Sequence, residues 1–222
     1  MIDASVTDAP YLSLRLRPDG QVHVRGAATC QLGQSLDYGH ESPDGVFAWW
    51  RWDGSALRAA NDRYGMQPLF YARDGEGIAL SSSLPRLLLE GAPADLDEAA
   101  LAVFLRTGYF VGEDTAFRAI RALPPNARLE WSGGRLHVSG GLPLPPRQTM
   151  TRDEAIDAYI PLFREAVRRR LPAEGPGEPE LVMPLSGGRD SRHILLELLL
   201  LGCRPAFCLT VRHHLPRVDQ DA

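Results

Sequence analysis

The sequence contains no lysine, so all 24 of its basic residues are arginine. A Walker-type phosphate loop, a Schiff base and a kinase-like ATP site each depend on a lysine amine, and this chain cannot supply one. The formal net charge of −4 gives no support to a polyanionic partner, so nucleic acid is not expected.

Cysteine is scarce and long apolar runs are absent. Cys30, Cys203 and Cys208 form no Cys-x-x-Cys pair, which fits a reducing compartment better than a disulfide scaffold. No Cys or His lies at metal-site spacing, so a zinc site is not expected. No apolar run approaches the roughly 18 residues of a membrane span, and the acidic N-terminus lacks a signal-peptide layout. We therefore expect a cytoplasmic protein with no membrane partner.

The first 140 residues are expected to form short antiparallel strands. Asp19-Gly20, Asp53-Gly54 and Asp74-Gly75 each lie between two apolar or alternating segments, which is typical of hairpins. Helical patterns follow, with a short one in LPRLLLEG and a longer one in which Asp95 and Glu98 have capping-box spacing.

The tetrapeptide SGGR occurs twice, at Ser132 and at Ser186. The first copy lies between the alternating segments RLEW and RLHV, so Gly133-Gly134 are predicted to form a hairpin turn with positive φ. Proline and glycine then break the pattern, and residues 141–150 are predicted to be a linker. Thr151 and Glu154 have capping-box spacing before a helical pattern that contains Pro161.

The second SGGR copy has a different context. The apolar run LVMPL precedes it, an apolar helical pattern ending at Gly202 follows it, and PAFCLTV then predicts a second buried strand. Strand, glycine loop, helix and strand form a βαβ unit, in which ligands bind beyond the carboxyl ends of the strands. Backbone N–H groups, two serine hydroxyls and the helix dipole suit a pyrophosphate, although an ordinary strand-to-helix turn can have the same composition.

Several segments together resemble the asparagine synthase family of the PP-loop ATP pyrophosphatase superfamily. LSGGRDS matches the SGGxDS loop of that superfamily. Upstream, NDRYGMQPLFYA resembles a RDRFGIKPLYY-like run, GIALSSSLPRLLLEG resembles FASEIKALL, and the segment GYFVGEDTAFRAIRALPPN resembles a GY…T.F..I..LPPG pattern. These matches keep the family's order over about residues 45–222.

The resemblance implies an α+β N-terminal domain at 1–140, degenerate and glutaminase-like (Ntn-hydrolase type) with antiparallel strands. A linker at 141–150 and the beginning of an α/β PP-loop (adenine nucleotide alpha hydrolase-like) domain at 151–222 follow. The cofactors would be ATP and Mg²⁺, with Asp190 as a metal ligand. The Arg189 side chain is expected to be exposed to solvent, and the His193 side chain is expected to pack against other residues. Leu209 and Thr210 would lie near the adenosine, and the ATP and pyrophosphate ligands would be Leu185, Ser186, Gly187, Gly188, Asp190 and Ser191.

Two departures from the family limit the expected activity. Glutamine-hydrolysing members use an N-terminal cysteine nucleophile, whereas residue 2 here is Ile2, so the catalytic residues are unknown and the glutaminase is expected to be inactive. Asp62 to Gly65 match the family but are expected to form a structural turn. The parallel sheet of such an ATP domain needs more strands than this chain supplies, so we expect a C-terminally truncated chain with an uncovered edge.

The leading hypothesis is an ATP-dependent amide-forming ligase that activates a carboxylate as an acyl-adenylate for attack by ammonia or an amine. The substrate would be a small-molecule or peptide carboxylate, and a homodimer or a partner protein is left open. One alternative is a macrolactam- or β-lactam-forming cyclase of the same family. Another is a non-catalytic interaction module with a vestigial ATP loop.

Overall fold

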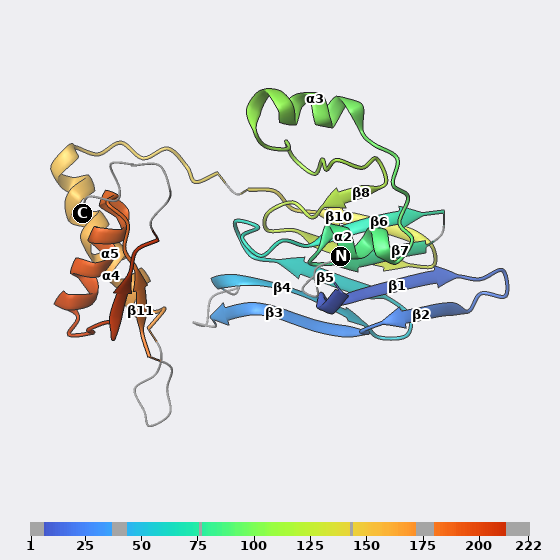
Figure 1. Cartoon of the computed structure of the whole chain (residues 1–222), viewed down its shortest axis with the longest axis horizontal. Coiled ribbons are helices and arrows are strands. Elements are labelled where there is room, and N and C mark those ends of the chain that lie inside the picture. Colours follow the sequence, from blue (N-terminus) through green and yellow to red (C-terminus); the bar gives the residue numbers. More distant parts are fainter. Residues whose placement is uncertain (1–6, 37–43, 76, 143, 172–179, 212–222) are drawn as a thin grey trace. The chain divides into compact units, whose positions relative to one another are not determined.

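The computed structural model describes residues 7–36, 44–75, 77–142, 144–171 and 180–211. The chain divides into two compact units, Met1–Pro145 and Pro146–Ala222 (Figure 1). Within these described residues, the first unit contains two five-stranded antiparallel sheets with short helices, and the second contains two helices and a pair of parallel strands. None of the described helices is long and apolar enough to cross a membrane.

One five-stranded sheet has the order β2-β1-β7-β6-β8. Two of the predicted hairpins are confirmed here, since β1 pairs with β2 around Gly20 and β6 pairs with β7 around Gly75. Both glycines have positive φ, +80° and +56°, which these tight turns require. The strands are β1 (Tyr11–Leu16), β2 (Val22–Gly26), β6 (Phe70–Asp74), β7 (Gly77–Ser81) and β8 (Ile120–Ala122).

The other five-stranded sheet has the order β10-β9-β5-β4-β3. The hairpin predicted at Asp53-Gly54 is confirmed as the connection between β4 and β5. β3 and β8 are additional to the strands that the sequence predicts. The strands of this sheet are β3 (Thr29–Leu36), β4 (Asp44–Trp52), β5 (Leu57–Asn61), β9 (Arg128–Ser132) and β10 (Arg135–Ser139).

The first SGGR copy forms the hairpin turn that the sequence predicts. β9 ends at Ser132 and β10 begins at Arg135, and the two strands pair antiparallel from that point. Gly133 and Gly134 have φ of +54° and +76°. Two successive residues with positive φ are the mark of a type I′ turn, so this copy closes a hairpin.

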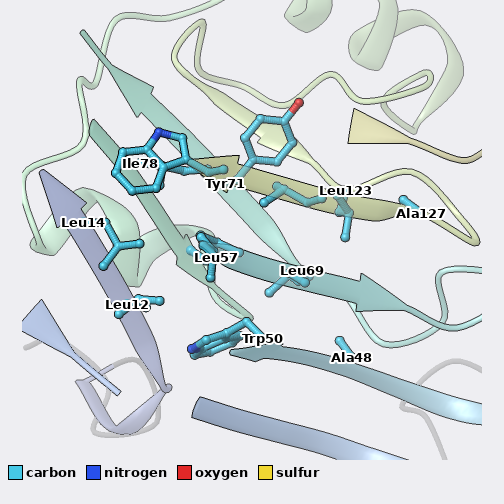
Figure 2. Packing of buried hydrophobic residues seen from close by; sticks show 14 residues of the cluster. Leu12, Leu14, Ala48, Trp50, Leu57, Leu69, Tyr71, Ile78, Leu123 and Ala127 are labelled. Carbon is cyan, nitrogen blue, oxygen red and sulfur yellow. The ribbon is translucent and has the colours of Figure 1, made fainter. Parts of the chain in front are cut away.

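The inward faces of the two sheets share one apolar core (Figure 2). Leu12 and Leu14 come from β1, and Trp50 and Leu57 come from β4 and β5; all four side chains are at most 1% exposed. Burial of apolar surface stabilises a fold by about 25 cal/mol per Å². The indole N–H of Trp50 donates to the carbonyl of Ala27 at 2.8 Å, so this large ring is buried without losing its hydrogen bond.

Helix α2 (Leu84–Leu89) covers the other face of the β6–β7 side of the first sheet. Ser83 caps the helix, because its hydroxyl accepts a hydrogen bond from the backbone N–H of Arg86. Leu87 of α2 is fully buried and packs with Ala72 and Ile120 in a second apolar cluster. The first sheet is therefore covered on both faces around β6 and β7.

Helix α3 (Glu98–Thr107) begins at a different cap from the predicted one. Its N-cap is Asp97, whose carboxylate accepts from the N–H of Ala100 at 3.1 Å, so the capping box expected from Asp95 is wrong. The backbone of Asp95 and Asp97 is bonded to Arg118 and Ala116, on either side of a bridge between Leu96 and Phe117. These pairings hold residues 95–97 extended, so the helix can begin only after them.

The second unit contains α4 (Arg152–Arg168), β11 (Val182–Pro184), α5 (Arg189–Leu200) and β12 (Phe207–Leu209). The capping box of Thr151 and Glu154 is confirmed in both directions. Pro161 lies inside α4, which continues through it to Arg168. At the end of α5, Gly202 has a φ of +79°, and the N–H of Cys203 reaches back to the carbonyl of Leu198.

The predicted burial of the two strands of this unit is only partly correct. Met183 of β11 is 7% exposed, but Phe207 and Leu209 of β12 are 54% and 51% exposed. Apolar composition favours burial only where another layer covers the side chains. Within the described residues no further strand extends this sheet beyond β12, so the prediction of a buried second strand is wrong for this part of the chain.

Candidate functional site

The second SGGR copy lies at the carboxyl ends of two parallel strands. β11 and β12 pair in register through Pro184 and Leu209, and the N–H of Leu185 donates to the carbonyl of Leu209 at 2.9 Å. The chain then leaves the sheet through Ser186 and Gly187 and enters α5 at Gly188. The loop therefore has the position at which parallel sheets bind ligands.

Two serine hydroxyls hold this loop in shape. The hydroxyl of Ser191 accepts from the N–H of Ser186 at 3.2 Å and donates to the carbonyl of Ser186 at 3.0 Å. The hydroxyl of Ser186 lies 3.1 Å from that of Ser191 and accepts from the N–H of Gly188 at 3.2 Å. The structure thus brings the loop together with the first turn of α5.

The N-terminus of α5 has no side-chain cap, unlike the other described helices. Gly188 is the N-cap and carries no side chain, whereas Ser83, Asp97 and Thr151 cap α2, α3 and α4. The first N–H groups of a helix have no partner within it, and together with the helix dipole they attract an anion. An uncapped helix beside a glycine loop suits a phosphate group.

The two residues predicted to lie near the adenosine do reach this loop. Thr210 follows β12, and its hydroxyl donates to the carbonyl of Leu185 at 2.6 Å. Leu209 contributes its backbone carbonyl to the same junction, and its side chain is half-exposed. The hydroxyl of Thr210 therefore links the end of β12 to the start of the loop that follows β11.

Asp190, the residue predicted to bind Mg²⁺, lies exposed in the first turn of α5. No group of three or more His, Cys, Asp or Glu in the described parts of the chain is placed to hold a metal on its own. Mg²⁺ is often held by one or two carboxylates together with the phosphates of a nucleotide. A single exposed carboxylate beside the loop fits that mode of binding.

Three neighbouring side chains complete the surroundings of the loop. Arg189 is exposed, as expected. His193 is exposed and stacks on Phe163 of α4 with ring centroids 4.1 Å apart, so it makes a packing contact of the kind expected. Arg192 was not predicted to take part: its Nε donates to the carbonyl of Gly188 at 3.3 Å. The only sequence signal for this contact is its spacing of four residues from the loop.

Helices α4 and α5 are joined by a contact that sequence reasoning also missed. Glu197 of α5 is 5% exposed and pairs with the guanidinium of Arg164 of α4. A buried carboxylate is stable only with such a partner. The pair therefore fixes the helix that begins at the loop against its neighbour.

In the first unit, the turn at Asp62 is structural, as predicted. The Asp62 side chain is 1% exposed, and its carboxylate accepts from the backbone N–H groups of Tyr64 and Met66 at 3.0 Å and of Gln67 at 2.8 Å. Asn61 beside it donates to the carbonyl of Pro124 and accepts from the N–H of Ala127. Asp62 thus holds its own turn together, whereas Asn61 joins this turn to the distant segment at Pro124 and Ala127.

Cys30 is the one cysteine of this unit, and it lies within β3. Burial raises the pKa of its thiol, which lowers the fraction of the nucleophilic thiolate. Cys30 therefore has neither the electrostatic activation nor the terminal amine of an N-terminal nucleophile.

The first unit has the α+β architecture of a glutaminase-like domain, with two antiparallel sheets packed face to face. The family described as the glutamine amidotransferase domain matches residues 17–139, more than half of the chain, and the chain belongs to this family. It is also 28% identical over 156 residues to "Asparagine synthetase [glutamine-hydrolyzing] 3" of Bacillus subtilis (strain 168). That alignment covers 68% of this chain and 25% of the relative, so the chain spans about a quarter of that protein's length. Together these matches confirm the predicted membership of the asparagine synthase family.

Proposed function

We propose that this chain forms part of an ATP-dependent, amide-forming ligase of asparagine synthase type, and that residues 151–222 begin its PP-loop domain. The observation that carries the proposal is the uncapped N-terminus of α5, which follows a serine-glycine loop at the carboxyl ends of two parallel strands. The family membership of the first unit supports it, because the relative is named as an asparagine synthetase. Under this proposal, the loop Leu185–Ser191 binds ATP and its pyrophosphate.

The arrangement suits adenylation of a carboxylate. The substrate carboxylate attacks the α-phosphorus of ATP, the bond to the bridging oxygen breaks, and pyrophosphate leaves. Backbone N–H groups at the start of α5 and the hydroxyl of Ser186 stabilise the leaving pyrophosphate. Asp190 would hold Mg²⁺, which neutralises phosphate charge when bound. Ammonia or an amine then attacks the acyl carbon and releases AMP.

The properties of Cys30 bear on the source of nitrogen. Because this thiol lies within a strand and burial raises its pKa, the first unit has no activated thiol among its described residues. We therefore propose free ammonia or an amine as the nitrogen donor. An amine belonging to the substrate itself would give a macrolactam- or β-lactam-forming cyclase, which is the second candidate. The acceptor would be a small-molecule or peptide carboxylate.

Binding of ATP with Mg²⁺ to the full chain tests the loop, and the two SGGR copies provide a matched pair of variants. Ser186→Ala removes a hydroxyl that contacts the loop, whereas Ser132→Ala removes a hydroxyl that contacts Ser55 in a hairpin. We expect Ser186→Ala to weaken ATP binding about tenfold, the loss typical of a hydrogen bond to a charged group. Ser132→Ala should leave the affinity unchanged. Equal affinities for both variants would refute the assignment of the loop.

Exchange of radiolabelled pyrophosphate into ATP tests the ligase itself. A carboxylate that is adenylated reversibly should support this exchange, and Asp190→Asn should reduce it. If ATP binds but no carboxylate in a broad panel supports exchange, the ligase proposal fails and the non-catalytic module takes its place.

A further inference from the structure

The face of the β10-β9-β5-β4-β3 sheet that points away from the core carries a row of polar side chains. Strand register places Thr29 opposite Arg51, Arg51 opposite Arg58, Arg58 opposite Glu130, and Glu130 opposite His137. All five side chains are exposed. Their neighbours in sequence, such as Trp50 and Leu57, point into the core instead, as alternation along a strand requires. This face is called the outer face below.

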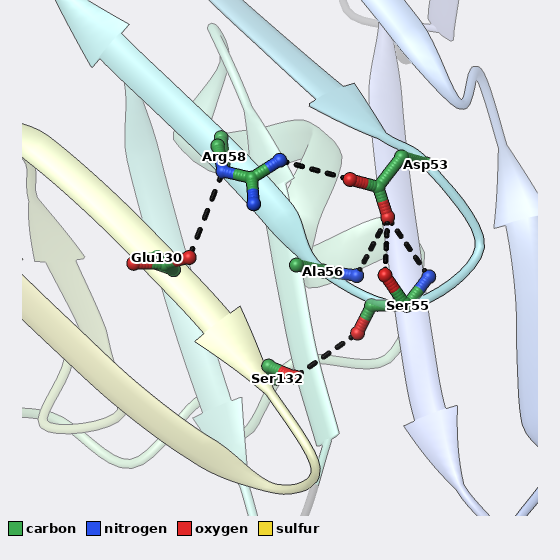
Figure 3. Close-up of polar contacts among 6 residues, drawn as sticks. All are labelled: Asp53, Ser55, Ala56, Arg58, Glu130 and Ser132. Atoms are coloured by element: carbon green, nitrogen blue, oxygen red, sulfur yellow. Dashed lines mark hydrogen bonds and ion pairs between the residues drawn. The ribbon is translucent and has the colours of Figure 1, made fainter.

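Arg58 on the outer face is neutralised by two carboxylates (Figure 3). Its guanidinium lies 2.8 Å from Asp53 and 3.6 Å from Glu130. The other oxygen of Asp53 accepts from the N–H and hydroxyl of Ser55 and from the N–H of Ala56. These bonds hold the pKa of Asp53 well below its usual range, so this carboxylate stays charged. Both of its oxygens already accept hydrogen bonds.

Arg51 has no such neutralising contact. No hydrogen bond or ion pair of its side chain exists within the described residues, and both carboxylates nearest in register are already committed to Arg58. Arg51 is therefore an exposed guanidinium that can bind an anion, beside an Arg58 whose charge is already balanced by Asp53 and Glu130.

A hollow of about 510 Å³ lies beside Arg51, and its lining includes Thr29, Gln31, Trp49, Arg51, Asp53 and Arg58. Thr29 and Gln31 add neutral hydrogen-bond donors next to the guanidinium. Register places Trp49 opposite Gln31 on the outer face, where it is half-buried. The lining thus combines the Arg51 guanidinium with two neutral polar side chains and the Trp49 ring, while the Asp53 carboxylate in the same lining is paired with Arg58.

We propose that this hollow binds the carboxylate group of a small aromatic or apolar acid. The planar fork of the Arg51 guanidinium matches a carboxylate in a bidentate contact. Thr29 and Gln31 would donate to the same group, and the indole of Trp49 would contact the body of the acid. An inorganic anion would make no apolar contact with the Trp49 ring. A cation would be repelled by Arg51, and the Asp53 carboxylate in the lining is already paired with Arg58.

This site differs from the ATP loop in both residues and ligand. It belongs to the unit Met1–Pro145 and uses none of the residues between Leu185 and Thr210. The proposal therefore does not depend on the ligase activity.

The test is a titration of the full chain with benzoate, followed by ¹H–¹⁵N NMR of the tryptophan indoles. The chain has four tryptophans, and the Trp49→Phe variant identifies the signal of Trp49. Benzoate should shift this signal in a saturable, one-to-one manner. Benzamide has the same ring without the charge, so it should bind at least about tenfold more weakly if a charged hydrogen bond contributes as usual. Inorganic phosphate should also bind more weakly than benzoate.

Two arginine variants separate a specific site from general attraction. Arg51→Gln removes the cation of the hollow and should abolish saturation by benzoate. Arg135→Gln removes an exposed arginine of β10 that does not line the hollow, and it should leave benzoate binding intact. Far-UV circular dichroism checks that both variants are folded. The proposal is overturned if benzoate and benzamide shift Trp49 equally, if phosphate binds as tightly as benzoate, or if the two variants behave alike.

Discussion

An oxygen of the buried Asp62 carboxylate accepts a 2.8 Å hydrogen bond from the backbone N–H of Gln67, five residues further along the chain. The same oxygen lies 3.3 Å from the backbone nitrogen of Phe47 in β4, and the other oxygen accepts from Tyr64 and Met66. One side chain thus organises the whole turn after β5. This turn is a structural element of the amidotransferase-type domain.

Asp62→Asn should destabilise this domain. The amide places an N–H donor where an oxygen accepts from backbone N–H groups, so at least one buried donor loses its partner. We expect the free energy of unfolding to fall by about 3 kcal/mol. Urea denaturation followed by tryptophan fluorescence measures it, because Trp49, Trp50, Trp52 and Trp131 all belong to this unit. Asp97→Asn serves as the control, since asparagine caps a helix as well as aspartate does. Equal stability of the two variants would contradict this role of Asp62.

Cysteine reactivity should distinguish Cys30 from Cys208. Burial raises the pKa of Cys30, whereas Cys208 on β12 is exposed. At pH 8 we expect iodoacetamide to modify Cys30 at least about tenfold more slowly, because the thiolate is the reacting form and must also be accessible. Peptide mapping by mass spectrometry gives both rates. Faster labelling of Cys30 would indicate an activated nucleophile and would reopen glutamine hydrolysis.

Glu165 should contribute to the stability of α4 in a pH-dependent way. Hydrogen bonds from Arg168 and Arg169 lower the pKa of Glu165 from 4.5 to about 2. A carboxyl whose pKa is lower in the folded state stabilises the fold above its unfolded pKa, and this contribution is lost as the pH falls from 4.5 towards 2. Carboxyl ¹³C NMR should show the late titration, and Glu165→Gln should remove it. A midpoint near 4.5 would show that the two arginines do not hold this group in solution.

Thr210→Val should weaken ATP binding without unfolding the protein. The hydroxyl of Thr210 donates to the carbonyl of Leu185 at 2.6 Å, so its loss frees the start of the loop from the neighbouring strand. We expect a loss of about fivefold in affinity, typical of one neutral hydrogen bond. The matched control is Thr107→Val, which removes an exposed hydroxyl that bonds within α3. Isothermal titration calorimetry with Mg²⁺ and ATP provides the measurement, and equal losses in both variants would argue against a role in positioning.

The sequence predicts those parts of the fold that depend on neighbouring residues. Gly133-Gly134 form a turn because alternating segments flank them on both sides, and Thr151 and Glu154 cap a helix through local bonds. The sequence predicts the wrong start for α3, because a bridge from Leu96 to Phe117, far along the chain, holds the residue before Asp97 extended. Whether β12 is buried depends on whether other strands or helices pack against it, and the apolar composition of the segment does not predict that.

The residues of the candidate sites also include some that neighbouring residues in the sequence predict and some that depend on the folded structure. Ser186 and Ser191 could be found because the loop motif is contiguous, and the structure brings their hydroxyls together. The contact of Arg164 with Glu197 and the opposition of Arg51 and Arg58 arise from elements that meet only after folding. Neither pair has a sequence pattern, because helix packing and strand register decide them.

The hydroxyl of Ser191 has a thermodynamic consequence for any ligand of the loop. Since it is bonded at both the N–H and the carbonyl of Ser186, the backbone there has already lost its conformational entropy during folding. A phosphate would therefore meet a preorganised surface and would not have to order it. We expect the Ser191→Ala variant to reveal this as a more unfavourable entropy of binding, with the loop becoming ordered only when the ligand arrives.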